Sequence, residues 1–245
     1  MRIAVLVSGG GTNLQALIDA QEQAASAHGT SAGTRAASVS PVSPVSPVSS
    51  VSSVSPVSSV SRFSRPSRGL YEIALVIADR NDTYAIERAR KAGIPAVLAL
   101  PPQGVSREEA RLAVSNRVLE LAKEYRCDAL VLAGFLTILS GPVIDAYANR
   151  IVNLHPALLP KFGGKGMWGH HVHEAVLAAG ETESGCTIHL VDSGCDTGPI
   201  LLQKKVPVLP GDSAETLAAR ISEQEHEAIV EGVSTLARRL AGLST

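Results

Sequence analysis

Short apolar runs alternate along the chain with stretches whose apolar residues recur at helical spacing. The runs predict strands, and the amphipathic stretches predict helices between them. Because each run is apolar throughout, both faces of each strand are expected to be covered, which is typical of a parallel sheet. Strands are predicted at residues 3–7, 72–78, 96–100, 129–133 and 151–154.

Turn and capping signals set the boundaries of the first helices. One helix begins near Thr12, directly after three glycines, and a second is capped by Asp82 and ends at Gly93. Ser106 and Glu109 form a capping box for a third. The alternating order predicts an α/β fold, a doubly wound, mostly parallel sheet with helices on both faces.

The last third of the chain departs from this alternation. Residues 187–191 and 200–206 predict two further strands, whose close succession is compatible with antiparallel pairing. Asp212 and Glu215 then open a long helix that reaches about Ala241. We expect one domain over residues 1–245.

Residues 38–69 differ from everything around them. They repeat Val-Ser-Pro and Val-Ser-Ser units and contain no acidic residue. Proline at this density is incompatible with helix interiors and central strands, and a period of three matches neither. The segment is predicted to be a disordered Ser/Pro-rich insertion within the domain.

Composition excludes several classes of function. The chain has 245 residues, with 22 Lys+Arg against 23 Asp+Glu, so it lacks the positive charge typical of nucleic-acid binding. No apolar run approaches the roughly 18 residues of a membrane span. Cys127, Cys186 and Cys195 show no disulfide or zinc spacing. We therefore expect a cytoplasmic protein with small-molecule partners, and neither nucleic acid nor membrane.

The glycine-rich turn after the first strand is a candidate anion site. Gly10, Gly11, Thr12 and Asn13 lead into a helix, whose first N–H groups and positive dipole end favour a phosphate. The turn is not a Walker A loop, and Leu14 stands where the dinucleotide fingerprint has its third glycine. Asp79 keeps a dinucleotide ribose contact open as a weaker alternative, and a tight turn without a ligand is the other.

Polar residues also follow the fifth predicted strand. If this strand continues through His155, then Asn153 and His155 point to the same face. Asp196 lies in a glycine-rich loop, where a carboxylate either caps a turn or sets the protonation state of a histidine. For Asn153 and His155 the alternative is a satisfied structural pair.

Two further polar features have structural alternatives. Gln224 and Glu225 interrupt the apolar stripe of the C-terminal helix, which indicates either a ligand contact or a wet patch at a kink. His170, His171 and His173 cluster in a glycine-rich loop without matching ligands elsewhere, so we expect no metal.

Taken together, the motifs resemble the folate-dependent formyltransferases. The resemblance rests on the segments VLAGFLTILS, NLHPALLPKF, DSGCDTGPI and QEHE, and the SGGGTN loop is similar to the glycinamide ribonucleotide branch. The resemblance covers nearly the whole chain except the Ser/Pro-rich segment. It implies the formyltransferase fold and transfer of the formyl group of 10-formyltetrahydrofolate, as cosubstrate, to glycinamide ribonucleotide in de novo purine biosynthesis.

The resemblance also implies roles for individual residues. Asn153, His155 and Asp196 would be catalytic, with His189 supporting them. The substrate phosphate would bind Gly10, Gly11, Thr12 and Asn13, and the ribose or amine would bind Glu225. The folate would lie between two loops that contribute Leu132, Phe135, Leu136, Thr137, Ile138 and Leu139, and Val191, Asp192, Ser193, Gly194 and Cys195.

The chemistry of formyl transfer agrees with the roles that the resemblance implies. An Asn amide can donate to a tetrahedral oxyanion, and a His–Asp pair can move a proton, with Asp196 holding the charge of His155. Two rival hypotheses are a methionyl-tRNA formyltransferase and a formyltetrahydrofolate hydrolase, each of which is expected to need an extra domain. A third is a non-catalytic module that binds a phosphate ligand. The segment 163–169 is longer and richer in glycine than the corresponding segment of the best-known family members. The sequence does not distinguish a monomer from a homodimer.

Overall fold

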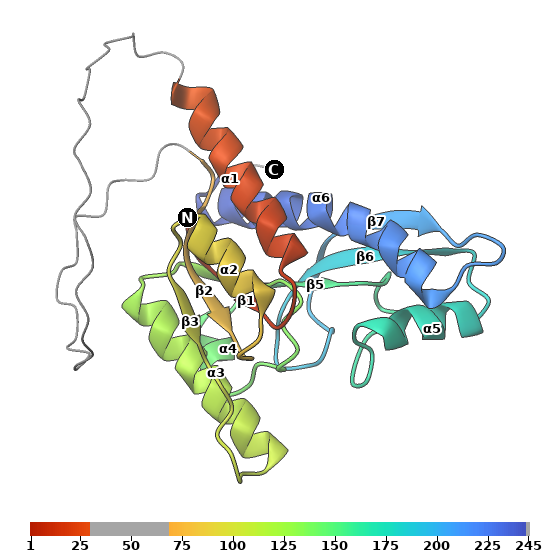
Figure 1. Ribbon diagram of the computed structural model, residues 1–245, viewed down its shortest axis with the longest axis horizontal. Helices are drawn as coiled ribbons and strands as arrows, with labels where there is room; N and C mark the ends of the chain where they lie inside the picture. The colour runs from red at the N-terminus through yellow and green to blue at the C-terminus, as the bar shows by residue number, and fades with distance from the viewer. Residues whose placement is uncertain (30–68, 244–245) are drawn as a thin grey trace, which may run out of the picture.

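A computed structural model describes residues 1–29 and 69–243 as a seven-stranded sheet flanked by helices (Figure 1). The predicted Ser/Pro-rich insertion lies, except for Gly69, outside the described residues. The strands are β1 (Arg2–Val7), β2 (Glu72–Ala78), β3 (Ala96–Leu98), β4 (Ala129–Leu132), β5 (Ile151–His155), β6 (Glu183–Leu190) and β7 (Ile200–Pro207). The helices are α1 (Thr12–Gly29), α2 (Tyr84–Lys91), α3 (Arg107–Glu124), α4 (Pro142–Ala146), α5 (His170–Ala178) and α6 (Ala214–Leu240).

The sheet has the order β3-β2-β1-β4-β5-β6-β7. Strands β1 to β5 are parallel, and β6 and β7 are antiparallel to their neighbours. The chain moves outward from β1 through β2 to β3 and then returns to place β4 on the other side of β1. Such a switch in strand order opens a crevice at the carboxyl ends of the strands, where ligands of α/β proteins bind.

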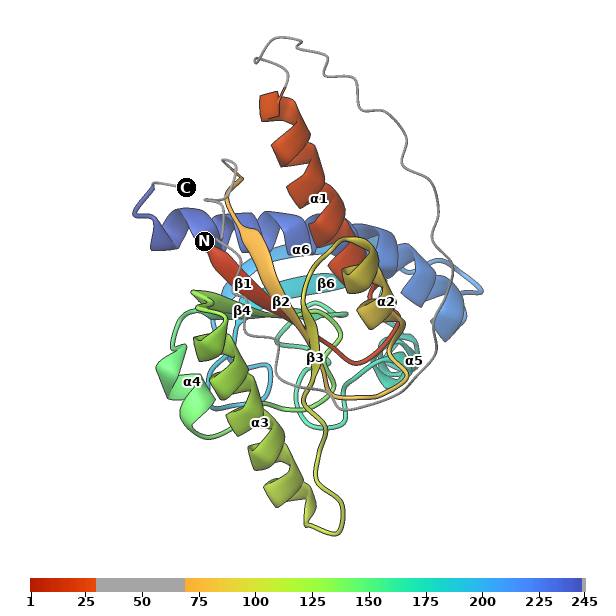
Figure 2. The ribbon, with the colours of Figure 1, turned by 60° about the vertical axis from the view of Figure 1, so that its left-hand side comes forward.

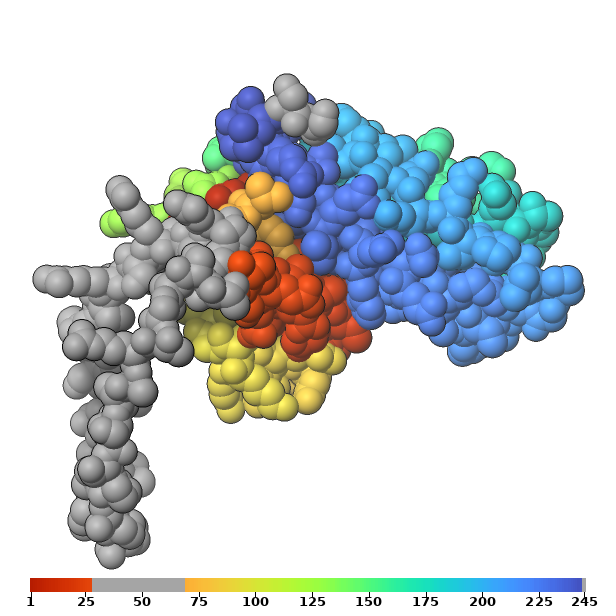
Figure 3. All heavy atoms as spheres, turned by 90° about the horizontal axis from the view of Figure 1, so that it is seen from above, coloured from red at the N-terminus to blue at the C-terminus, as the bar shows by residue number. Residues whose placement is uncertain are grey.

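Helices cover both faces, as the sequence predicts. Ile3, Val5 and Val7 of β1 pack with apolar residues of α1, α2 and α6, whereas Ala4 and Leu6 pack with those of α3 and α4. Figure 2 shows these two helix layers on opposite sides of the sheet. From above, α1 and α6 lie side by side over one face (Figure 3).

Of the two predicted caps, one is wrong and one is confirmed, and α6 begins just after Asp212, as predicted. Thr83, not Asp82, is the N-cap of α2, and its hydroxyl donates to the Arg80 carbonyl instead of capping. Ser213 caps α6 in a capping box with Thr216, while Asp212 binds Arg220. The predicted capping box of α3 is present.

Helix α6 runs without a break from Ala214 to Leu240. This continuity disfavours the alternative in which Gln224 and Glu225 form a wet patch at a kink. The apolar stripe of α6 is buried, as predicted. Within the described part of the chain, no helix combines the length and apolarity needed to cross a bilayer.

Candidate active site

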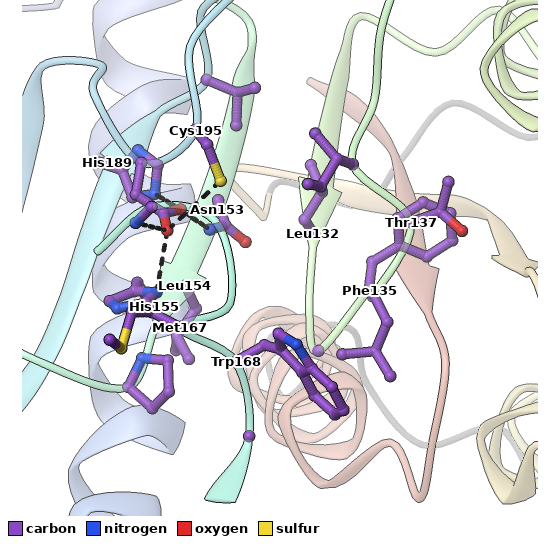
Figure 4. A pocket seen from close by; sticks show the side chains of 18 of the residues that line it. Leu132, Phe135, Thr137, Asn153, Leu154, His155, Met167, Trp168, His189 and Cys195 are labelled. Carbon is purple, nitrogen blue, oxygen red and sulfur yellow. Dashed lines mark hydrogen bonds and ion pairs between the residues drawn. The ribbon is translucent and has the colours of Figure 1, made fainter. Parts of the chain in front are cut away.

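A pocket of about 550 Å³ lies at the carboxyl ends of β4 and β5. Its walls are formed by the loops after these strands, the loop after β6, a glycine-rich segment before α5, and one face of α6. In Figure 4, Asn153, His155 and His189 gather on one wall, and Leu132 and Phe135 lie across from them. The pocket therefore joins a polar wall to an apolar one.

Strand β5 brings Asn153 and His155 to the same wall. The strand continues through His155, so the two side chains share one face of the sheet, as predicted, and both line the pocket. His155 is only 3% exposed. Pairing of β5 with β4 on one side and β6 on the other fixes the position of both side chains.

The loop after β6 delivers Asp196 to this pair. Its Oδ2 lies 3.5 Å from His155 Nδ1 and accepts a hydrogen bond from the Gly164 N–H at 3.0 Å. Asp196 has a φ of 58°, which is costly for a residue other than glycine and is characteristic of functional sites. The predicted meeting of Asn153, His155 and Asp196 is thus present in the structure.

A backbone carbonyl orients the His155 ring. His155 Nε2 lies 2.8 Å from the Phe162 carbonyl oxygen, which only accepts hydrogen bonds. Nε2 therefore carries a hydrogen, and in the neutral ring Nδ1 presents a lone pair toward Asp196. This nitrogen is ready to accept a proton.

Electrostatics keep the two groups in different charge states. Burial lowers the pKa of His155, and the nearby Asp196 only partly offsets that effect. Burial acts to raise the pKa of Asp196, but contacts with His189 and the Gly164 N–H hold it below its ordinary value. The expectation that Asp196 keeps His155 charged is therefore incomplete: the resting ring is neutral, and Asp196 stabilises it once protonated.

His189 orients the amide of Asn153. His189 Nδ1 lies 2.9 Å from the Leu190 carbonyl, so in the neutral ring Nε2 accepts a hydrogen bond from Asn153 Nδ2 at 3.0 Å. The same Nε2 lies 3.5 Å from Asp196 Oδ1, and it interacts favourably with this carboxylate when the ring is protonated. The second Nδ2 hydrogen has only a long contact, 3.4 Å, with Asp196. This long hydrogen bond is the one that a ligand oxygen in the pocket can replace.

The glycine turn before α1 lies mostly outside the pocket lining. Asn13 lines it, whereas Gly10, Gly11 and Thr12 lie beyond the lining residues. Gly11 has a φ of 71°, and a Cβ there would lie 2.6 Å from the Ala85 Cβ, so packing on α2 requires this glycine. Gly10 faces open space, and its carbonyl accepts a hydrogen bond from Arg88.

Glu225 connects α6 to this turn. Its Oε2 accepts a hydrogen bond from Asn13 Nδ2 at 3.1 Å, and the side chain lines the pocket. Burial raises the pKa of Glu225, while the hydrogen bond from Asn13 acts in the opposite direction. Gln224, by contrast, faces a groove between α1 and α6.

The loop after β4 forms the apolar wall. All the predicted folate-site residues of this loop line the pocket: Leu132, Phe135, Leu136, Thr137, Ile138 and Leu139.

Three hydrogen bonds that involve side chains anchor this loop. The Leu136 N–H donates to Ser8 Oγ, the Ser140 N–H donates to Ser115 Oγ, and the Thr137 hydroxyl donates to Asp79. Asp79 thus holds a loop, and it lies outside the pocket lining. Its geometry gives no support to a dinucleotide ribose contact.

The loop after β6 agrees with prediction except at one residue. Val191, Asp192, Gly194 and Cys195 line the pocket, but Ser193 does not. Asp192 caps its own turn by accepting hydrogen bonds from the Gly194 N–H and the Thr197 hydroxyl. Cys127, Cys186 and Cys195 are all free thiols, as their spacing predicts.

Several lining residues were not predicted. Lys165, Met167, Trp168 and His173 come from the segment before α5 and from α5 itself. Helix α5 contains His170, His171 and His173, so their placement in a glycine-rich loop was wrong. The Val-His-Glu-Ala-Val pattern was the signal for this helix. Within residues 1–29 and 69–243, no group of three or more His, Cys, Asp or Glu side chains is arranged to hold a metal ion.

Known proteins resemble this chain over most of its length. The formyl transferase family model matches residues 52–233. A trifunctional purine biosynthetic protein adenosine-3 of Drosophila pseudoobscura pseudoobscura is 38% identical over 96% of this chain, which spans only 14% of that protein. The phosphoribosylglycinamide formyltransferase of Escherichia coli (strain K12) is 33% identical over 92% of this chain and 82% of its own length.

Solved structures agree with this relationship. A glycinamide ribonucleotide transformylase 1 from Symbiobacterium toebii superposes with a TM-score of 0.72 at 34% identity, covering 98% of this chain and 88% of that one. A phosphoribosylglycinamide formyltransferase from Brucella melitensis gives 0.68 at 33% identity, with coverage of 96% and 95%. The fold, the pocket and these relatives place this chain in the formyl transferase family.

Proposed function

We propose that this chain transfers the formyl group of 10-formyltetrahydrofolate to the amine of glycinamide ribonucleotide, a step of de novo purine biosynthesis. The observation that carries the proposal is the convergence of Asn153, His155 and Asp196 at the junction of a polar and an apolar wall. Relatives that are named for this activity, and that resemble nearly the whole chain, support it.

The pocket and the adjoining N-terminus of α1 provide a separate place for each substrate. We assign the folate to the wall formed by residues 132–139 and 191–195, because its flat pterin and benzoyl rings suit apolar surface. The substrate phosphate is assigned to the N-terminus of α1, where Gly10, Gly11, Thr12 and Asn13 offer backbone N–H groups. Glu225 then accepts hydrogen bonds from the ribose or the amine. No metal enters this scheme.

Each catalytic residue has one task in the transfer. The substrate amine attacks the formyl carbon, and the Asn153 amide donates a hydrogen bond to the oxyanion that forms. His155 Nδ1 takes the proton that the amine loses, and Asp196 stabilises the resulting imidazolium. When the bond between the formyl carbon and folate N10 breaks, His155 returns the proton to N10. The products are the formylated amine and tetrahydrofolate.

The substrates lead to proposals about location and assembly. A cytoplasmic enzyme that acts as a monomer or homodimer on two small molecules is the simplest arrangement, and free cysteines are compatible with a reducing compartment. The compartment is tested by fractionation of the source cells.

A spectrophotometric assay tests the proposed activity. Purified full-length protein is mixed with glycinamide ribonucleotide and a 10-formyl folate, and the absorbance of the deformylated folate is followed. We expect turnover that requires both substrates, and Asp196→Asn is expected to abolish most of it. Deformylation of the folate in the absence of glycinamide ribonucleotide would indicate a hydrolase. A folded sample that binds the ligands without turnover would indicate a non-catalytic module.

A further inference from the structure

One buried histidine on the pocket wall has no task in the proposed transfer. His173 lies in the first turns of α5, is 5% exposed and lines the pocket. Its Nδ1 is sealed from solvent and has no hydrogen-bond partner among the described residues. Because buried polar groups are normally paired, such an atom calls for an explanation.

The buried Nδ1 determines which nitrogen of the His173 ring carries the hydrogen. An orphaned buried N–H is rarer than an orphaned acceptor, so the neutral ring carries its hydrogen on Nε2. Burial lowers the pKa of His173, and positive charge on His170 or His155 acts in the same direction. The ring is therefore neutral near pH 7, and it presents a single N–H donor on the side that the pocket can reach.

The position of His173 indicates which part of a substrate it meets. The phosphate end of the pocket is at Asn13, and the reacting amine must lie at His155 and Asp196. The sugar has to bridge these two places. His173 lines the pocket, as do Ala218, Ser222 and Glu225 of α6, and Glu225 is hydrogen-bonded to Asn13. Because α5 packs against α6, we assign His173 and this face of α6 to the wall that the sugar meets.

A hydroxyl can form hydrogen bonds with two polar side chains of this wall, His173 and Glu225. It can donate a hydrogen bond to the Glu225 carboxylate and accept one from the His173 N–H at the same time. Neither an ether oxygen nor a carbon-bound hydrogen can do both. The substrate amine can also donate and accept, but the transfer requires it at His155 and Asp196. A ribose hydroxyl is therefore the group that we assign to this wall.

We propose that His173 donates a hydrogen bond to a ribose hydroxyl of glycinamide ribonucleotide and that, with Glu225, it selects ribose over deoxyribose substrates. This inference rests on the proposed function. It assigns His173 as a specificity-determining residue, separate from the proton transfer at His155.

The test compares glycinamide ribonucleotide with its 2′-deoxy and 3′-deoxy analogues. For the wild-type protein we expect kcat/KM to fall at least roughly tenfold on removal of one hydroxyl, the size of a lost hydrogen bond. His173→Phe keeps a ring of similar volume without nitrogen atoms. It should lower kcat/KM roughly tenfold for the ribose substrate, through KM, and leave kcat/KM for that deoxy analogue unchanged.

Two further variants serve as controls. His173→Gln retains an N–H donor near the position of Nε2 and should recover part of the discrimination even if His173→Phe folds poorly. His226→Gln changes a histidine of α6 that faces the groove between α1 and α6, and whose Nε2 is likewise buried and unpartnered. It should leave the discrimination intact.

Two results would overturn the inference. One is a folded His173→Phe protein that discriminates between ribose and deoxyribose substrates as the wild type does, or a folded His173→Gln protein that discriminates no better than His173→Phe. The other is wild-type turnover that is indifferent to both hydroxyls. Absence of any wild-type turnover would instead refute the proposed function, so the two failures are distinguishable.

Discussion

At the residue scale, hydrogen-bond partners fix which atoms are free to react. The Phe162 carbonyl holds a hydrogen on His155 Nε2, and His189 takes one hydrogen of the Asn153 amide. A proton acceptor at His155 Nδ1 and a single amide donor at Asn153 remain. These assignments lead to separate predictions for the two side chains.

Asn153→Ala should lower kcat by roughly 10²- to 10³-fold, because it removes the proposed oxyanion donor. Substrate KM values should change little, since the oxyanion exists only during the transfer. Steady-state kinetics with each substrate varied in turn measure both quantities. Asn116→Ala, an exposed change on α3, is the matched control. A loss confined to KM would contradict the assigned role.

His155→Ala and Asp196→Asn should be strongly non-additive, because the two side chains act on one proton. The double variant should be little slower than the slower single variant. Removing the negative charge of Asp196 also lowers the His155 pKa further. The limb of the kcat/KM profile that reports His155 should therefore move to lower pH in Asp196→Asn. Additive losses with an unshifted profile would show that Asp196 only shapes its loop.

At the element scale, sequence periodicity predicted the parallel strands and the two sides of the sheet, because buried strands are apolar throughout. It did not predict the short helix α4, and α5 was missed because glycines precede it and histidines begin it. Sequence also could not reveal that backbone groups, the Phe162 carbonyl and the Gly164 N–H, hold the catalytic side chains. Such contacts depend on the path of the loop after Pro160, not on the identity of side chains.

The turn before α1 allows a paired test. Gly11→Val should destabilise the protein by about 1–3 kcal/mol, because its φ is 71° and its Cβ would meet Ala85. Gly10→Val has open space around its Cβ and should leave the thermal midpoint nearly unchanged. It should nevertheless raise the KM for glycinamide ribonucleotide if the phosphate approaches there, with the folate KM unaffected. An unchanged KM in a stable Gly10→Val protein would remove the phosphate from this turn.

At the scale of the whole molecule, the described residues build the pocket from loops at one edge of the sheet, the segment before α5 and one face of α6. The Ser/Pro-rich segment is predicted from composition to be dispensable. Its repeats cannot bury enough apolar surface to offset the entropy of ordering them. Deletion of residues 38–65 should therefore preserve turnover and lower the thermal midpoint by no more than a few degrees. A larger drop in calorimetry would show that the segment packs on the domain.

The central claim is that a formyl group passes directly from folate to the amine of glycinamide ribonucleotide. A single-turnover reaction with 10-formyltetrahydrofolate labelled with ¹³C at the formyl carbon, followed by NMR, tests it most directly. We predict that the labelled carbon appears as an amide of the glycinamide product, with an equal amount of tetrahydrofolate. Recovery of the label as free formate, or in unchanged folate, would contradict the account.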